Sequence, residues 1–253
     1  VKPDYAEAYF NMGNALNDKG ELEAAISTYK KALKVKPDYA EAYFNMGNAL
    51  KNQGDREAAI ESYTKTLKIK PEFADAYINM GISLKAMGDL EAAIDSFKQV
   101  LKIKPDCAES HYNLGNVLQD KGDLESAIDS FKKALKIKPD YAEVYNNMGV
   151  AFNNKGDLEA SIDSFKKALK IKPDYTEAYD NMGNAFNDKG DQEAAINSFK
   201  NALKIKPDCA QAYNNMGNAL KNKGDLEAAI KSYTKALKIK PNFAEAYNNM
   251  GAA

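Results

Sequence analysis

The side chains whose type and spacing could do chemistry in this 253-residue chain are asparagines that recur every 34 residues. One set, the first-row asparagines, is Asn11, Asn45, Asn79, Asn113, Asn147, Asn181, Asn215 and Asn249. A second set three residues further on, the second-row asparagines, is Asn14, Asn48, Asn116, Asn184 and Asn218. A carboxamide has two N–H donors and an acceptor oxygen, so it pairs with both the C=O and the N–H of a peptide backbone. The spacing therefore predicts a ladder of peptide-binding amides.

An asparagine within a helix is about half a kcal/mol less favourable than alanine, so an array with no use for these amides would gain by replacing them. Two alternatives stay open. Duplication copies a residue without any use for it, and each amide could bond an acidic neighbour on its own face. Against copying, the residue six places after each first-row asparagine has diverged: it is Asn17, Lys51, Lys85, Gln119, Asn153, Asn187 and Lys221.

Catalytic and metal-binding chemistry has little support in the sequence. The only histidine, His111, occupies a position that other units fill with Tyr43, Tyr77 or Tyr145, which is typical of a packing residue. One histidine and two distant cysteines provide neither a metal-ligand set nor a nucleophile–base pair. The repeated aspartates fit helix caps. We therefore expect no enzyme activity, no metal and no cofactor.

Charge and cysteine use narrow the partners and the location. The net charge of −1 gives no overall attraction to nucleic acid or an anionic membrane, and no apolar run approaches a membrane span in length. Cys107 and Cys209 lie three units apart, too far for an internal disulfide in an elongated array. Free thiols at packing positions fit a reducing compartment, so we expect a cytoplasmic protein.

The elements that position the asparagines follow the same spacing. Proline occurs only at Pro3, Pro37, Pro71, Pro105, Pro139, Pro173, Pro207 and Pro241. A fixed period of 20 to 50 residues indicates a stack of identical units, here a single array over residues 1–253. The expected units are residues 6–39, 40–73, 74–107, 108–141, 142–175, 176–209 and 210–243, with a first helix alone at 244–253. The chain lacks an initial Met and stops within a unit, so we expect it to be a fragment.

Each unit predicts a pair of helices, as residues 40–73 illustrate. Asp38 and Glu41 have the spacing of a capping box before the first helix. Gly54 supplies a left-handed residue that ends this helix, and Asp55 caps the second. Because one such pair cannot bury its apolar face alone, neighbouring pairs must stack.

The seventh unit carries the residues of a known repeat pattern, Trp-x2-Leu-Gly-x2-Tyr, then Ala-x3-Phe, then Pro. They are Tyr213, Met216, Gly217, Leu220, Ala229, Tyr233 and Pro241. The chain thus resembles the tetratricopeptide repeat (TPR) family from end to end, with apolar-for-apolar departures such as Tyr for Trp. The resemblance implies an all-α fold: a right-handed superhelical α-solenoid of antiparallel helix pairs, whose first helices line a concave groove.

The asparagine rows also resemble the TPR domain of O-linked N-acetylglucosamine transferases, in which concave asparagines at the same repeat position clasp substrate backbones. This resemblance implies that Asn11 through Asn249 bind peptide. It covers the repeats alone. Nothing in the chain matches a glycosyltransferase catalytic domain, so no transferase activity is expected here.

Charge on the predicted inner arc of the first helices narrows the ligand further. Its acidic residues are Glu7, Asp18, Glu41, Asp75, Glu109, Asp120, Glu143, Glu177, Asp180 and Asp188. Its basic residues are Lys51, Lys85 and Lys221, which leaves a net charge of −7 over the seven full units. We therefore expect the partner to be an extended protein or peptide segment that is neutral or basic, and neither nucleic acid nor membrane.

A self-assembling scaffold is the alternative function. Tyr5, Tyr9 and Met12 at one end, and Tyr247 and Met250 at the other, belong to apolar faces with no expected partner helix. Uncapped ends of this kind stack head to tail. An engineered repeat protein is a third interpretation, disfavoured by scattered departures from the repeat that look like natural drift.

Overall fold

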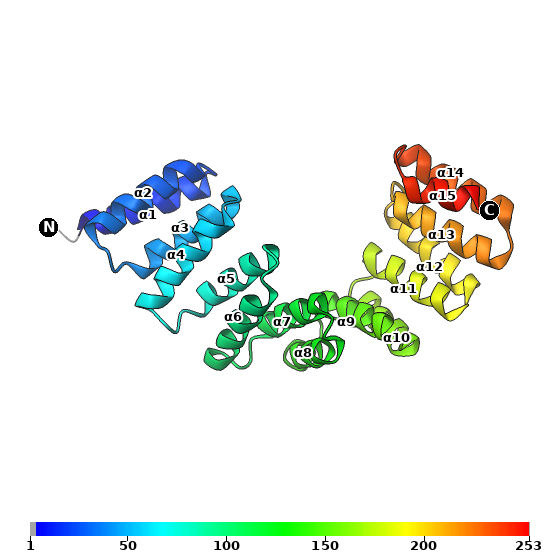
Figure 1. The fold of residues 1–253 in the computed structure, drawn as a ribbon, viewed down its shortest axis with the longest axis horizontal. Helices are drawn as coiled ribbons and strands as arrows, with labels where there is room; N and C mark the ends of the chain where they lie inside the picture. Colours follow the sequence, from blue (N-terminus) through cyan, green and yellow to red (C-terminus); the bar gives the residue numbers. More distant parts are fainter. Residues whose placement is uncertain (1–3, 253) are drawn as a thin grey trace. The chain divides into compact units, whose positions relative to one another are not determined.

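The computed structural model describes residues 4–252, so Pro3 and Ala253 lie outside the described residues; every regular element in the described range is an α-helix (Figure 1). The chain divides into two compact parts between Asp123 and Leu124. The N-terminal part holds α1 (Asp4–Asp18), α2 (Leu22–Val35), α3 (Ala40–Gln53), α4 (Arg56–Ile69), α5 (Ala74–Ala86), α6 (Leu90–Ile103) and α7 (Ala108–Lys121). The C-terminal part holds α8 (Leu124–Ile137), α9 (Ala142–Lys155), α10 (Leu158–Ile171), α11 (Thr176–Lys189), α12 (Gln192–Ile205), α13 (Ala210–Lys223), α14 (Leu226–Ile239) and α15 (Ala244–Gly251). The predicted all-α fold is confirmed.

Odd-numbered helices, here called first helices, alternate with even-numbered second helices. Within each part every helix packs against its successor, and the short turns make the two helices of a pair antiparallel. Neighbouring first helices also adjoin, with α1 against α3 and α9 against α11 among them. Successive members of the asparagine rows therefore come from adjoining helices within each part.

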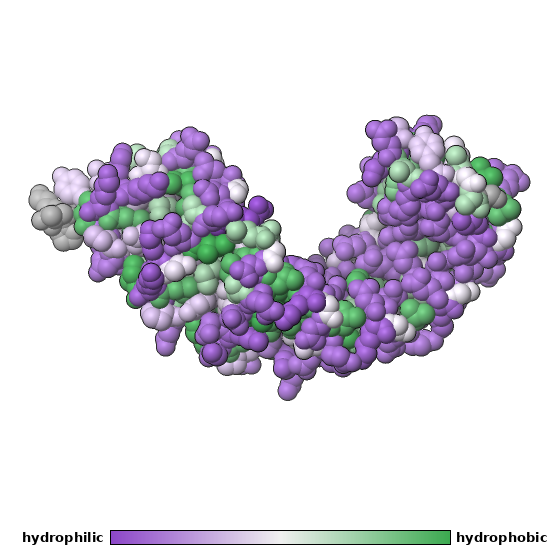
Figure 2. Space-filling view, in the orientation of Figure 1, coloured by the Kyte–Doolittle hydropathy of each residue, from purple (hydrophilic) through white to green (hydrophobic). Residues whose placement is uncertain are grey.

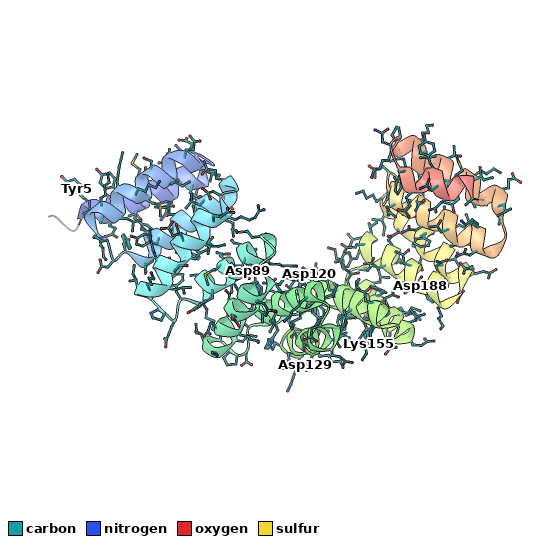
Figure 3. The ribbon with its side chains drawn as sticks, viewed as in Figure 1. Tyr5, Asp89, Asp120, Asp129, Lys155 and Asp188 are labelled. Carbon is teal, nitrogen blue, oxygen red and sulfur yellow. The ribbon has the colours of Figure 1, made fainter. Side chains whose placement is uncertain are left out.

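The turn between the two helices of a pair is built as predicted. Gly54 has φ +97° at the end of α3, a left-handed conformation that glycine adopts without strain. The Asp55 side chain caps α4 by accepting a 3.0 Å hydrogen bond from the backbone N–H of Ala58. Asp89 and Asp157 cap α6 and α10 in the same way, and Asp89 is labelled in Figure 3.

The predicted capping box before α3 is wrong. The residue that precedes α3 is Tyr39, and no side chain bonds the N–H groups of the first turn. Asp38 lies one place too early to reach them. Glu41 pairs instead with Lys70 after α4, and the hydrogen bond from Lys70 holds the pKa of Glu41 below its ordinary value.

A glycine on the first helix lets the two helices of a pair approach closely. A Cβ on Gly47 would lie 2.6 Å from Cε1 of Tyr63, whose side chain is fully buried. Gly217 has the same relation to Tyr233. The ring of the second helix therefore lies against the backbone of the first, and its hydroxyl reaches the surface where the asparagines are.

Candidate functional site

The asparagines of both rows lie on first helices, and all are half-buried except Asn11, which is exposed. Their surroundings differ between the two parts of the chain. In the view of Figure 2, hydrophobic side chains show among hydrophilic ones over α1 to α6, whereas the surface over α11 to α13 is mainly hydrophilic.

In the N-terminal part, a first-row amide donates to the second-row oxygen of the preceding first helix. Asn45 Nδ2 lies 2.8 Å from Asn14 Oδ1, and Asn79 Nδ2 lies 2.9 Å from Asn48 Oδ1. The residue just before the asparagine on the preceding helix, Phe10 for Asn45, has no side-chain acceptor to offer. The amides thus tie successive helix pairs together.

The second-row oxygens in this part accept a further hydrogen bond from a tyrosine. The hydroxyl of Tyr29 donates to Asn14 Oδ1 at 2.8 Å, and that of Tyr63 donates to Asn48 Oδ1 at 2.9 Å. Burial raises the pKa of Tyr29 to about 12, with a further increase from the charge of Asp18. The hydroxyls therefore remain protonated donors at neutral pH.

These bonds leave part of each amide available. Among the described residues, the Nδ2 groups of Asn14 and Asn48 donate to no protein atom, and Oδ1 of Asn45 accepts from none. Oδ1 of Asn79 accepts a 3.2 Å hydrogen bond from Nζ of Lys51. The surface of α1 and α3 thus offers donors from one row and an acceptor from the other.

Asn113 on α7 is different, because its whole carboxamide makes no hydrogen bond with the described chain. The two places on α5 from which an acceptor would come are Ile78 and Ile82. Two aliphatic side chains therefore leave this half-buried amide without a protein partner.

In the C-terminal part, three first-row amides donate to a different acceptor. This acceptor is on the preceding first helix, in the residue immediately before the first-row asparagine of that helix. The three contacts are Asn181 Nδ2 to Asn146 Oδ1 at 3.1 Å, Asn215 Nδ2 to Asp180 Oδ2 at 3.2 Å, and Asn249 Nδ2 to Asn214 Oδ1 at 3.1 Å. Polar residues occupy this place here, where the N-terminal part has Phe10, Phe44, Ile78 and Tyr112.

This change of acceptor frees Asn184 on α11. Asn215 donates to Asp180 instead, and the aromatic residue of α12 is Phe199, which has no hydroxyl. Asn184 therefore makes no hydrogen bond with the described chain, whereas Asn218 on α13 accepts from the hydroxyl of Tyr233 at 2.8 Å. Asn113 and Asn184 are the two half-buried members of the rows whose complete carboxamides are unpaired.

The remaining asparagines have partners. Asn147 accepts a 3.1 Å hydrogen bond from Nδ2 of Asn146, and Asn116 is also engaged. Asn215 accepts at 3.1 Å from Gln211 on its own helix face. Several of these amides therefore bond a side chain on the adjoining helix, rather than the acidic neighbour on their own face that the sequence left open as an alternative.

Asp180 supplies the most perturbed charge near the rows. Burial raises the pKa of its carboxyl from 3.8 to about 6, the hydrogen bond from Asn215 opposes the rise, and the charge of Glu177 adds to it. Asp180 forms no ion pair within the described chain. A carboxylate in this position disfavours an acidic ligand beside Asn184.

Sequence reasoning missed the bonds between the rows, but a signal for them exists. Tyrosine occurs on the second helix only where the paired first helix has a second-row asparagine, as in Tyr29 with Asn14. Where the first helix has Ile82 or Val150, the second has phenylalanine. The hydroxyl is present only where an acceptor exists.

Other kinds of site receive no support from the described residues. No group of three His, Cys, Asp or Glu side chains lies close enough there to hold a metal ion. The ring of His111 is within 3.2 Å of the carbonyl oxygen of Pro105. In the range 4–252 no helix has the length and apolar character needed to cross a membrane.

Models of one repeat family match most of the chain. The model described as "TPR repeat" matches residues 13–54, 83–122, 117–156, 183–224 and 217–253, and that described as "Tetratricopeptide repeat" matches 40–73 and 142–175. A comparison with curated proteins found no match.

Solved structures share the fold. A tetratricopeptide repeat protein from Parabacteroides merdae is 18% identical with a TM-score of 0.76, over 98% of this chain and 98% of that one. The MamA protein is 28% identical with a TM-score of 0.62, over 68% of this chain and 94% of its own. YrrB, described as a TPR protein with an unusual peptide-binding site, is 25% identical with a TM-score of 0.60, over 75% and 97%.

Proposed function

Because the chain belongs to the tetratricopeptide repeat family, whose arrays are protein–protein interaction modules, we propose that it binds extended peptide segments through the asparagines of its first helices. One observation carries this proposal: the half-buried carboxamides of Asn113 and Asn184 have no partner in the described chain. An amide in that state has its two donors and its acceptor available for a ligand backbone.

The other asparagines of the two rows support the same role, although only part of each carboxamide is available to a ligand. Near α1 and α3, the free Nδ2 group of Asn14 is a donor and the free Oδ1 of Asn45 is an acceptor. The bond between these two side chains fixes their orientation, so little conformational entropy is lost when a ligand binds. A peptide backbone would pair with one group from each row.

The spacing of the first helices suits an extended ligand. Packed helices lie about 8–10 Å apart, and an extended chain rises about 3.3 Å per residue. One member of a row would then meet about every third residue of the peptide. Side-chain identity in the ligand would matter little, because the contacts are with its backbone.

Two further points support the choice of ligand. YrrB, similar over three quarters of this chain, is described as having a peptide-binding site. The acidic arc, which includes the half-buried Asp180 of α11, favours neutral or basic segments over acidic ones and over nucleic acid. We assign the array no catalytic reaction, and the free thiols of Cys107 and Cys209 fit the cytoplasm.

The test is the double substitution Asn113→Ala and Asn184→Ala. Binding of a fluorescein-labelled, lysine-containing extended peptide should weaken by roughly tenfold or more, at about 1 kcal/mol for each lost hydrogen bond. Stability should hold or rise, since neither amide has a protein partner and alanine is the better helix former. Asn197→Ala, at an exposed site on the second helix α12, is the matched control. Equal affinity of the double variant and the control would refute the proposal.

Self-assembly through the ends of the array is the second candidate. Tyr5 is 58% exposed and Met12 is 55% exposed on α1, and Tyr247 is 52% exposed on α15; Tyr5 is labelled in Figure 3. Light scattering against protein concentration distinguishes the two functions. A mass that rises with concentration, and falls to that of one chain in Met12→Gln with Tyr247→Ser, supports a scaffold; one constant mass excludes it.

A further inference from the structure

A hollow of about 310 Å³ opens between α12 and α14 in the C-terminal part, above α13. Its apolar lining includes Ile196 of α12, and Met216 and Leu220 of α13. None of its residues belongs to the asparagine rows or to the acidic arc of the first helices. It is therefore a separate surface from the proposed peptide-binding one.

Lysines surround the hollow. Lys200 comes from α12, and Lys231 and Lys235 come from successive turns of α14. Lys231 forms an exposed ion pair with Glu227 at 2.7 Å, but Lys200 and Lys235 form none with the described residues. Asp225 also lines the hollow, where its Oδ1 is engaged by the backbone N–H of Ala228 at the start of α14. The rim is thus positive.

The positive charge arises from a local departure from the repeat. At the place equivalent to Lys231, α4, α8 and α10 have an acid that pairs with the lysine four residues later, as Asp129 does with Lys133 and Asp163 with Lys167, both at 2.7 Å. In α12 that acid is replaced by Asn197, and in α14 by a lysine. The acid that would neutralise the surface is missing only from α12 onward among the helices α8 to α14.

A buried hydroxyl lines the same hollow. Ser232 is 3% exposed, and its Oγ has no hydrogen-bond partner. The equivalent serines of other second helices donate to the carbonyl oxygen four residues earlier; these are Ser62, Ser96, Ser130, Ser164 and Ser198. Ser232 alone among these serines has no acceptor for its hydroxyl, and its Oγ is enclosed by the protein. The ammonium of Lys235 lies 5.4 Å from the centroid of the Tyr213 ring.

We propose that this hollow binds a short acidic peptide segment in which a carboxylate stands next to a large apolar side chain. The apolar side chain would occupy the space over Ile196, Met216 and Leu220, where its burial is favourable. The carboxylate would pair with Lys200 and Lys235, since charge-assisted bonds of this kind are the strong ones. This hollow would require an acidic ligand, whereas the first-helix surface favours neutral or basic peptides. The two sites would therefore bind different partners.

The experiment measures binding of a fluorescein-labelled Gly-Ser-Glu-Phe-Asp-Gly peptide and of its twin with Ser in place of Phe. The first should bind more tightly than the twin, and Lys200→Gln with Lys235→Gln should weaken it at least tenfold. Leu220→Phe should also weaken it, because phenylalanine would fill the floor; Phe152 and Phe186 already occupy the equivalent places.

The control is Lys98→Gln with Lys102→Gln on α6, an equal change of charge at exposed sites. The control and the Asn113→Ala, Asn184→Ala variant should bind the acidic peptide as the unmodified protein does. No binding at all, equal binding of the two peptides, or equal loss in the control would overturn the proposal. Competition by inorganic phosphate against both peptides alike would reduce the site to one for simple anions and would overturn it too.

Discussion

Asn45 on α3 donates a 2.8 Å hydrogen bond through Nδ2 to Oδ1 of Asn14 on α1. The same oxygen accepts a hydrogen bond from Tyr29 on α2. One carboxamide oxygen therefore joins three helices of two successive pairs. In an array where each pair contacts only its neighbours, such bonds belong to the interface free energy that holds the stack together.

Asn14→Ala should destabilise the array. The substitution leaves the buried Tyr29 hydroxyl and the Asn45 amide without their acceptor, which costs about 1–3 kcal/mol. Urea unfolding would measure it. Tyr29→Phe made in the Asn14→Ala background should cost much less than in the unmodified protein, and simple additivity of the two changes would contradict the shared bond.

Asn45→Ala and Asn113→Ala should differ in stability although they change equivalent residues. Asn45 loses its bond to Asn14, so the melting temperature should fall. Asn113 loses nothing within the chain and gains about half a kcal/mol in helix propensity, so its melting temperature should hold or rise. Equal falls in the two variants would show that Asn113 has a structural role.

Asp180 should make stability depend on pH. Its folded pKa of about 6 is above the ordinary 3.8, so the folded state binds the proton more tightly. The contribution is therefore favourable below about pH 4 and is lost as the pH rises through 6, a change on the order of 2 kcal/mol. Urea unfolding of the protein and of Asp180→Asn between pH 4 and pH 7 would measure it.

The Asp180→Asn variant should become the more stable of the two as the pH rises, and its amide would match Asn146 and Asn214 at the same place. The difference should survive added salt, because burial rather than distant charge is its main cause. A difference that does not vary with pH would contradict the raised pKa.

Gly47→Ala should destabilise the second helix pair by about 1–3 kcal/mol, because the new Cβ would lie 2.6 Å from the buried ring of Tyr63. Gly251 is the matched control. It holds the equivalent place on α15, where a Cβ would meet no atom within 4 Å. Gly251→Ala should leave the melting temperature unchanged or raise it, and equal losses at the two sites would rule out the steric cause.

Much of the fold follows from the sequence because its signals are local. Gly54 and Asp55 end one helix and begin the next through contacts within a few residues, and both act as predicted. The capping box at Asp38 was wrong for an equally local reason, since Tyr39 is the residue that precedes the helix. A shift of one residue at a helix end is beyond what spacing alone resolves.

The partners of the amides could not be predicted in the same way. Asn45 bonds a residue 31 places earlier and Asn181 bonds one 35 places earlier, and only the packing of adjoining helices brings either within reach. The acceptor depends on the residue immediately before the first-row asparagine of the preceding first helix. For Asn45 that residue is Phe10, which has no side-chain acceptor, and for Asn181 it is Asn146, which has one. The residue that determines the acceptor is visible in the sequence, but its effect can be predicted only when the two helices are known to adjoin.

Asn113 on α7 is therefore unpaired because of Ile78 and Ile82 on α5, and not because of a residue of α7 itself. Every first-row position has the same amide, so a mutation of the asparagine is not needed to create or abolish an available one. If the helix pair that contains α5 were copied to another place in the array, the first-row amide of the pair that follows it would have no acceptor and would be left unpaired. Recombination between units could in this way relocate a contact point along the chain while leaving each contacting residue untouched.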